Sequence, residues 1–294
     1  MTDGPRSLKD PAEVARRWAM LGEPRMAPLL DLVARIRAER GQTPFPDPLD
    51  GAAEARFLLL LETPGPSMAR TGFVSRDNAN GTAVNLWRFL RAAGIPRRDT
   101  LIWNVVPYVI HAPGARNRAP KPAEAADGAR FLLPLFDRLP NLTVIALSGR
   151  FARLARPDVE RFRPGLPLVE MPHPSPTYVN TSPSVRVRID EALTTVRGIL
   201  TEAEAGSPEA EQEHRSSPDV FSTISANQKE STMAIDKDRV EGSGKGIVGS
   251  IKEGIGKLTG DTKTEAEGKM DKAEGKVQNT VGGIKDTLRG DKRD

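Results

Sequence analysis

The chain has 294 residues, a formal net charge of +4 and no cysteine. Without cysteine it has no disulfides, thiolate metal sites, iron–sulfur clusters or cysteine nucleophiles, which fits a reducing compartment. The longest apolar runs, such as FLLLL at 57–61, are too short to cross a bilayer, and the opening MTDGPRSLKDP lacks an apolar signal segment. We expect a cytoplasmic protein, a monomer, that uses no metal, no cofactor and no membrane.

Strand-like and helix-like segments alternate along residues 1–205, which we predict to form one domain. Short, continuous apolar runs predict four buried strands. They are ARFLLLLET (55–63), TLIWNVVPYV (100–109), TVIALSG (143–149) and LPLVEMP (166–172). The segments GTAVNLWRFLRAAG (81–94) and AEAADGARFLLPLFDRL (123–139) predict helices between them. This alternation predicts a three-layer α/β/α domain around a central four-stranded parallel sheet.

A long helix is predicted after the last strand. Ser182 can cap this helix, and Pro183 suits its first turn. Apolar residues at helical spacing then form a single stripe, which predicts one buried face. The stripe comprises Val185, Ile189, Leu193, Val196 and Leu200.

The composition changes after residue 205. Residues 206–232 are polar with few apolar anchors, which predicts a flexible linker. Residues 233–294 are rich in glycine and lysine and contain neither aromatic residues nor proline. Narrow apolar stripes there have helical spacing, but each interior glycine costs a helix about 1 kcal/mol. We predict a small, marginally stable helical domain in which no catalytic group is visible.

Ligands of parallel α/β sheets collect at the carboxyl ends of the strands. In this sequence those ends are ETPGP (62–66), WNVVPY (103–108), SGR (148–150) and HPSPTYVN (173–180). His173 is one of three histidines and stands in a turn stiffened by two prolines. From these residues alone, a catalytic histidine and a histidine that merely fills a rigid turn are both open interpretations.

Arginine is frequent in the segments around the first two predicted strands. This clustering suits a phosphate backbone, although solvated surface arginines are the more common explanation. The cluster comprises Arg70, Arg76, Arg88, Arg91, Arg97, Arg98, Arg116, Arg118 and Lys121.

The order ETPGP, Gly72-Phe73, NLWRFL, WNVVPY and HPSP resembles the uracil-DNA glycosylase superfamily over roughly residues 50 to 200. Members of this superfamily flip a nucleotide out of the DNA and hydrolyse its N-glycosidic bond. The resemblance implies a DNA repair enzyme that acts on uracil or a related deaminated base in single- or double-stranded DNA. A non-catalytic nucleic-acid-binding domain is the first alternative, and a stress-response interaction protein is the second.

The resemblance also implies roles for individual residues. His173 would donate a hydrogen bond to the leaving base anion, and Asn104 would read the base edge with its amide. Phe73 would stack on the base, although an ordinary core phenylalanine remains an open interpretation. The base-binding and DNA-binding residues implied in addition are Pro64, Gly65, Ser175, Thr177, Tyr178, Arg116 and Arg118.

The loop after the first strand departs from the Gln-Asp-Pro-Tyr pattern of the superfamily's classical enzymes, because this chain reads Glu62-Thr63-Pro64-Gly65. It is closer to the Gly-Glu-Ala-Pro-Gly loop of the iron–sulfur branch, but the chain lacks the cysteines that would hold that branch's cluster. Thr63 stands where an aspartate would orient the attacking water. A threonine can orient a water but cannot act as a carboxylate base. Glu62 and Thr63 are therefore both catalytic candidates, and Glu62 has a second interpretation as a carboxylate that caps backbone donors or pairs with arginine.

The stretch from Met233 onward resembles the CsbD-like family of small bacterial stress-response proteins. The resemblance rests on DKDRVEG (236–242), GKLTGD (256–261) and EAEGKMDKAEGKVQ (265–278). It implies a stress-related module joined to the first domain.

Overall fold

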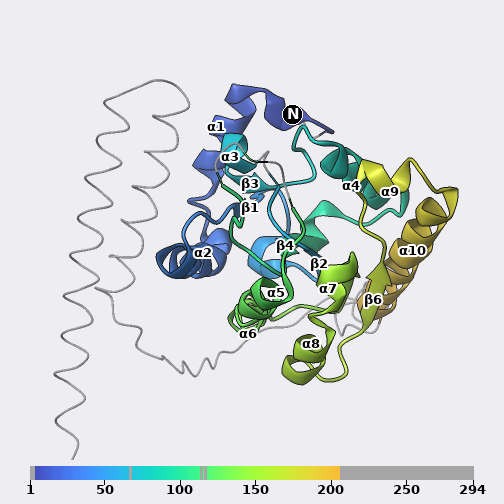
Figure 1. Cartoon of the computed structure of the whole chain (residues 1–294). Coiled ribbons are helices and arrows are strands. Elements are labelled where there is room, and N and C mark those ends of the chain that lie inside the picture. Colours follow the sequence, from blue (N-terminus) through green and yellow to red (C-terminus); the bar gives the residue numbers. More distant parts are fainter. Residues whose placement is uncertain (1–3, 66–67, 113–114, 116–117, 206–294) are drawn as a thin grey trace, which may run out of the picture. The chain divides into compact units, whose positions relative to one another are not determined.

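The computed structural model describes residues 4–65, 68–112, 115 and 118–205 (Figure 1). Contacts divide the chain into two units, Met1–Glu202 and Ala203–Asp294. The predicted linker 206–232, the predicted domain 233–294 and Arg116 lie outside the described residues and stay predictions.

A four-stranded parallel sheet forms the centre of the first unit, with the strand order β4-β2-β5-β6. The strands are β2 (Phe57–Leu61), β4 (Thr100–Asn104), β5 (Val144–Ser148) and β6 (Leu168–Met171). Every residue of β2, β4 and β5 is buried, as expected for strands covered on both faces. The predicted sheet is confirmed, and each strand is shorter than the apolar run that predicted it.

One face of the sheet is covered by α4 (Gly81–Ala92) and α10 (Pro183–Ala205) (Figure 1). Leu86 and Leu90 of α4 pack in one core cluster with Leu59 of β2 and with the predicted stripe of α10. The buried stripe residues are Ile189, Leu193, Val196 and Leu200, with Val185 partly buried beside them. The predicted helix and its apolar face are confirmed.

The opposite face is covered by α2 (Ala27–Arg40), α5 (Pro122–Ala129) and α6 (Leu132–Phe136) (Figure 1). The helix predicted over 123–139 is therefore two helices rather than one. Pro134 gives the physical reason, because it lacks an N–H and its ring would clash with the carbonyl of Arg130 in a continuous helix.

The residues before 50 form structure that the sequence patterns did not predict. They comprise η1 (Ser7–Lys9), α1 (Pro11–Met20), η2 (Pro24–Met26), α2 and β1 (Phe45–Pro46). The Asp10 side chain caps α1 by accepting a hydrogen bond from the Ala12 N–H at 2.9 Å. Strand β1 pairs in parallel with β3 (Phe73–Val74) in a second, two-stranded sheet.

Short elements complete the described chain. They are η3 (Ala52–Glu54), α3 (Met68–Thr71), η4 (Arg97–Asp99), α7 (Arg150–Arg153), α8 (Arg156–Phe162) and α9 (Pro176–Val179). Of these, α3, α7 and α9 follow the carboxyl ends of β2, β5 and β6. Among the helices of the described residues, none is both long and apolar enough to cross a bilayer.

Candidate active site

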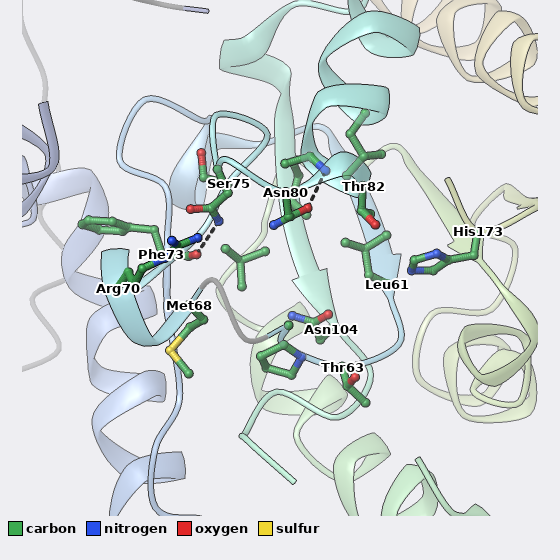
Figure 2. A pocket seen from close by; sticks show the side chains of 17 residues that line it. Leu61, Thr63, Met68, Arg70, Phe73, Ser75, Asn80, Thr82, Asn104 and His173 are labelled. Atoms are coloured by element: carbon green, nitrogen blue, oxygen red, sulfur yellow. Dashed lines mark hydrogen bonds between the residues drawn. The ribbon is translucent and has the colours of Figure 1, made fainter. Parts of the chain in front are cut away.

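A cavity of about 410 Å³ opens at the carboxyl edge of the central sheet (Figure 2). Segments far apart in the sequence meet there: the loop after β2, strand β3, the start of α4, the end of β4 and the turn after β6. Six of the predicted site residues line it, namely Thr63, Pro64, Gly65, Phe73, Asn104 and His173. The cavity is therefore the candidate active site.

Asn104 is the last residue of β4 and lies opposite Leu61 of β2. Its side chain is only 2% exposed, and its Oδ1 has no hydrogen-bond partner among the described residues. Leaving a buried acceptor unpaired costs about 1–3 kcal/mol. A ligand that donates a hydrogen bond to Oδ1 would remove that cost, so the cavity wall carries an acceptor suited to a polar ligand.

His173 follows β6, and residues of α4 contact the turn that contains it. The Nδ2 of Asn85 on α4 donates to the Pro174 carbonyl at 2.9 Å. Gly81 leaves room for the Pro176 ring, because a Cβ at Gly81 would lie 2.3 Å from Pro176 Cγ. Burial lowers the pKa of His173 below its ordinary value, and the negative charge of Glu62 partly opposes this shift. At neutral pH the imidazole is uncharged and donates from one nitrogen.

Glu62 is not among the residues that line the cavity. Its Oε1 accepts a hydrogen bond from the Phe151 N–H at 3.0 Å, in the first turn of α7. Gly149 permits this approach, because a Cβ there would lie 2.5 Å from Glu62 Oε1 and 3.2 Å from His173 Cβ. The carboxylate thus caps a backbone donor, as the second interpretation of Glu62 held, and its charge acts on His173.

Thr63 lies beside Asn104 in the cavity (Figure 2). None of the cavity-lining residues in the described chain is acidic. Thr63 therefore lines a cavity whose described wall carries no carboxylate.

Phe73 belongs to the core, which favours the ordinary core interpretation. It is fully buried, and its ring packs against Trp18 of α1, with ring centroids 5.4 Å apart. The residue is also among those that line the cavity, but its ring is drawn on the side away from Asn104 and His173 (Figure 2).

Several polar residues of the cavity wall were not predicted. They are Ser75, Asn78, Asn80 and Thr82, whereas Arg70, which also lines the cavity, belongs to the predicted arginine cluster. The amide of Asn78 spans two segments, since its Oδ1 accepts from Thr71 Oγ1 and its Nδ2 donates to the Phe73 carbonyl, both at 2.9 Å. The signal that could have found this wall is the polar run SRDNANGT (75–82) between a strand and a helix.

Of the residues predicted to contact DNA, Ser175, Thr177, Tyr178 and Arg118 are not among those that line the cavity. Ser175 precedes α9 and Thr177 and Tyr178 belong to it; the Tyr178 side chain is 56% exposed. Arg118 is exposed and already pairs with Glu124 at 2.6 Å.

Within the described part of the chain, no group of three or more His, Asp or Glu side chains could hold a metal ion.

Comparisons with known proteins match both parts of the chain. A model of the uracil DNA glycosylase superfamily matches residues 48–195, and a model of the CsbD-like family matches residues 238–290. A UPF0337 protein of Xanthomonas campestris pv. campestris is 53% identical over 38 residues, which are 13% of this chain and 61% of that protein. A UPF0337 protein of Xanthomonas axonopodis pv. citri is 50% identical over a stretch of the same length. The chain thus spans about 61% of the length of these curated relatives.

Proposed function

This chain belongs to the uracil DNA glycosylase superfamily, and from that premise we propose that its first unit hydrolyses the N-glycosidic bond of uracil, or of a related deaminated base, in DNA. Family membership supports a glycosylase-type function. The observation that carries the finer proposal is the meeting of Asn104 and His173 in one cavity, with Oδ1 of Asn104 buried and unpaired among the described residues.

Asn104 reads the base in this proposal. Uracil presents a ring N–H donor next to a carbonyl acceptor, and an amide side chain offers the complementary acceptor and donor. Cytosine lacks that N–H, so it would leave Oδ1 of Asn104 unpaired in a buried place. A site whose buried polar group stays unpaired with the wrong ligand discriminates strongly against it.

His173 stabilises the leaving base. When the bond between sugar C1′ and the base nitrogen breaks, the electron pair stays on the base, which becomes an anion. A fixed N–H donor directed at such developing charge contributes on the order of 3 kcal/mol to lowering the barrier. The prolines of HPSP and the hydrogen bond from Asn85 hold the turn that carries this donor.

Water completes the reaction. Its oxygen forms the new bond to C1′ as the base leaves, and one of its protons compensates the charge of the base anion. Thr63 is the residue we assign to orienting this water, since its hydroxyl can hold a water at the cavity wall. Glu62 acts on His173 rather than on the water, because it does not line the cavity and its charge opposes the lowered pKa of His173.

DNA contacts surround this site in the proposal. Tyr178, which is exposed on α9, would insert into the base stack when a nucleotide is flipped out. Ser175, Thr177 and Arg118 would contact the backbone, with Arg118 exchanging Glu124 for a phosphate.

In the experiment, the full chain is incubated with single-stranded and duplex oligonucleotides that carry one uracil, hypoxanthine, xanthine or cytosine, and abasic sites are counted. We expect abasic sites at uracil and none at cytosine, which lacks the ring N–H that Oδ1 of Asn104 accepts. Asn104→Asp keeps the shape but removes the amide donor, so the rate falls about 100-fold. Asn141→Asp makes the same chemical change at an exposed residue and leaves the rate unchanged. Equal rates for the two variants would contradict the role of Asn104.

One observation favours a second function, a non-catalytic nucleic-acid-binding domain: the absence of acidic residues from the cavity lining in the described chain. That function predicts binding of uracil-containing DNA without abasic sites at any base.

For residues 233–294 we propose a CsbD-like stress-response module that takes no part in base release.

A further inference from the structure

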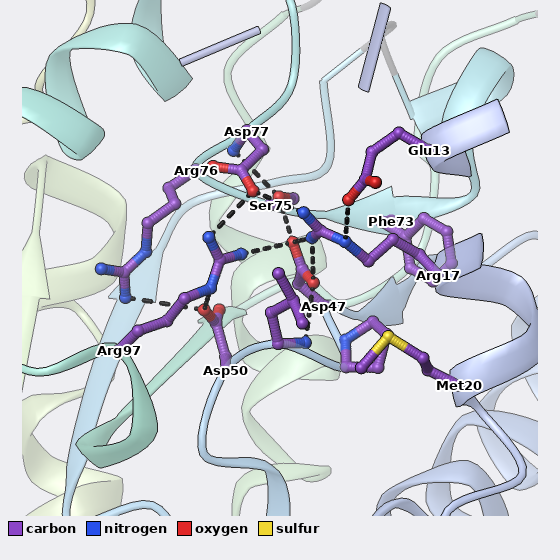
Figure 3. A network of polar contacts seen from close by, with 12 residues as sticks. Glu13, Arg17, Met20, Asp47, Asp50, Phe73, Ser75, Arg76, Asp77 and Arg97 are labelled. Carbon is purple, nitrogen blue, oxygen red and sulfur yellow. Dashed lines mark hydrogen bonds and ion pairs between the residues drawn. The ribbon is translucent and has the colours of Figure 1, made fainter. Parts of the chain in front are cut away.

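Behind the cavity wall lies a buried network of charges, which we call the α1 network: Glu13, Arg17, Asp47, Ser75, Asp77 and Arg97 (Figure 3). Arg17 of α1 is fully buried and donates to three carboxylates. Its Nε reaches Glu13 at 2.8 Å, its Nη1 reaches Asp47 at 2.6 Å and its Nη2 reaches Asp77 at 2.8 Å. Arg97 pairs with Asp47 at 2.7 Å and Asp77 at 2.8 Å from another side.

The α1 network touches the cavity through Ser75. The Ser75 hydroxyl donates to the Asp47 carboxylate and accepts a hydrogen bond from the Asp77 N–H at 2.9 Å. Ser75 also lines the cavity. The charge of Asp47 thereby fixes a residue of the cavity wall through a single hydroxyl.

Trp18, the neighbour of Arg17 on α1, contacts the residues that precede Ser75 in the same wall. Its Nε1 donates to the Thr71 carbonyl at 3.1 Å, and its ring packs on Phe73. Gly72 lies against this ring, since a Cβ there would meet Trp18 Cζ2 at 2.5 Å and its φ is +79°. Helix α1 therefore contacts the residues before β3 through Trp18, and it is linked to Ser75, just after β3, through Arg17 and Asp47.

These contacts fix the positions of the groups that they join more than they stabilise the fold. Buried ion pairs contribute little net free energy, because removing two charges from water offsets their attraction. What they supply is a fixed geometry, since the guanidinium of Arg17 can meet Glu13, Asp47 and Asp77 in one arrangement only. Arg17, Trp18 and Asp47 all precede residues 48–195, the stretch that the superfamily model matches.

We propose that helix α1 is a positioning element of the base cavity, in which Arg17 and Trp18 hold β3 and Ser75 in place at the cavity wall. Neither residue lines the cavity, so both act through the wall they hold. This inference rests on the proposed base release, and it extends the working site to a part of the chain that the superfamily match does not cover.

The test uses Trp18→Phe in the full chain, which keeps a packed ring but removes the Nε1–H. Ile36→Val serves as the control, because Ile36 is also fully buried but belongs to α2 and does not line the cavity. We expect Trp18→Phe to speed amide hydrogen exchange in residues 71–78 and to slow single-turnover base release roughly 10-fold with KM for DNA unchanged. Ile36→Val changes neither.

Arg17→Lys is a second variant in case Trp18→Phe folds poorly, since lysine keeps the charge but has one nitrogen in place of the three with which Arg17 reaches Glu13, Asp47 and Asp77. Unchanged exchange in residues 71–78, or an equal loss of rate in Ile36→Val, would overturn the inference. If the unaltered protein releases no base, the proposed function fails, while the exchange measurement still decides whether α1 holds the wall.

Discussion

Gly149 is the residue at which the loops that carry Glu62 and His173 come together. Its φ of +97° lies in the left-handed region, and an added Cβ would press on both side chains. Gly149→Ala therefore combines backbone strain of about 1–3 kcal/mol with displacement of His173. We expect a lower melting temperature and base release slowed about 10-fold or more, measured by an abasic-site assay.

Gly165→Ala is the matched control for this variant. Gly165 has a similar φ of +81° but no atom within 4 Å of an added Cβ. It should lose stability through strain alone and keep the wild-type rate. If both variants slow base release equally, the contact between Gly149 and His173 does not matter for the reaction.

The titration of His173 follows from its surroundings. Burial lowers its pKa below the ordinary value of 6.5, whereas the charge of Glu62 raises it. Below pH 6.5 the unfolded chain gains a proton that the folded chain resists, so the free energy of unfolding falls as pH drops toward the folded pKa. A His173→Gln variant should lose this part of the pH dependence, as measured by denaturant unfolding at several pH values.

Glu62→Gln tests the electrostatic link directly. Glutamine still accepts a hydrogen bond from the Phe151 N–H but carries no charge. The pKa of His173, followed by NMR of the imidazole, should therefore fall further in this variant. A pKa that stays constant or rises would show that Glu62 does not act on His173.

At the scale of the element, α4 supports the turn of His173 from outside the cavity. Asn85→Ala removes the donor to the Pro174 carbonyl, a hydrogen bond with a net contribution of about 1 kcal/mol. Base release should slow while DNA affinity, measured by fluorescence anisotropy, stays the same. Thr201→Ala also deletes one side-chain to backbone hydrogen bond, on α10 at 3.0 Å, and should leave the rate unchanged.

Helix α10 stabilises the sheet through its apolar stripe. Leu193 is fully buried there, so Leu193→Ala should lower the free energy of unfolding by about 2–5 kcal/mol. Val187 on the same helix is 54% exposed, and Val187→Ala should change the stability by less than about 0.5 kcal/mol. Denaturant unfolding that gave similar losses for both would contradict the assigned buried face.

The sequence predicted those elements whose signal is local. Four apolar runs sufficed to predict the sheet, and one apolar stripe sufficed to predict α10. The reason is that the spacing of apolar residues close together in the sequence indicates a buried strand or a buried helix face. Asn104 and His173 were found through short motifs at strand ends. Arg17 could not be found in this way, since its partners Asp47 and Asp77 lie 30 and 60 residues away and no local pattern records such contacts.

At the scale of the whole molecule, everything assigned to base release lies within the first unit. The cavity-lining residues lie between 61 and 173, and the α1 network lies between 13 and 97. A chain that ends after residue 205 should therefore release base at the rate of the full chain. A slower rate would instead assign part of the activity to the residues that follow.

Release of free uracil from a single-stranded oligonucleotide tests the central claim most directly. The full chain, His173→Ala and His111→Ala are compared by chromatography, with DNA binding measured in parallel. We predict release by the full chain and by His111→Ala, whose altered residue does not line the cavity, and a rate at least about 100-fold lower for His173→Ala with unchanged DNA binding. Binding of DNA by all three proteins without release of uracil by any of them would contradict the claim.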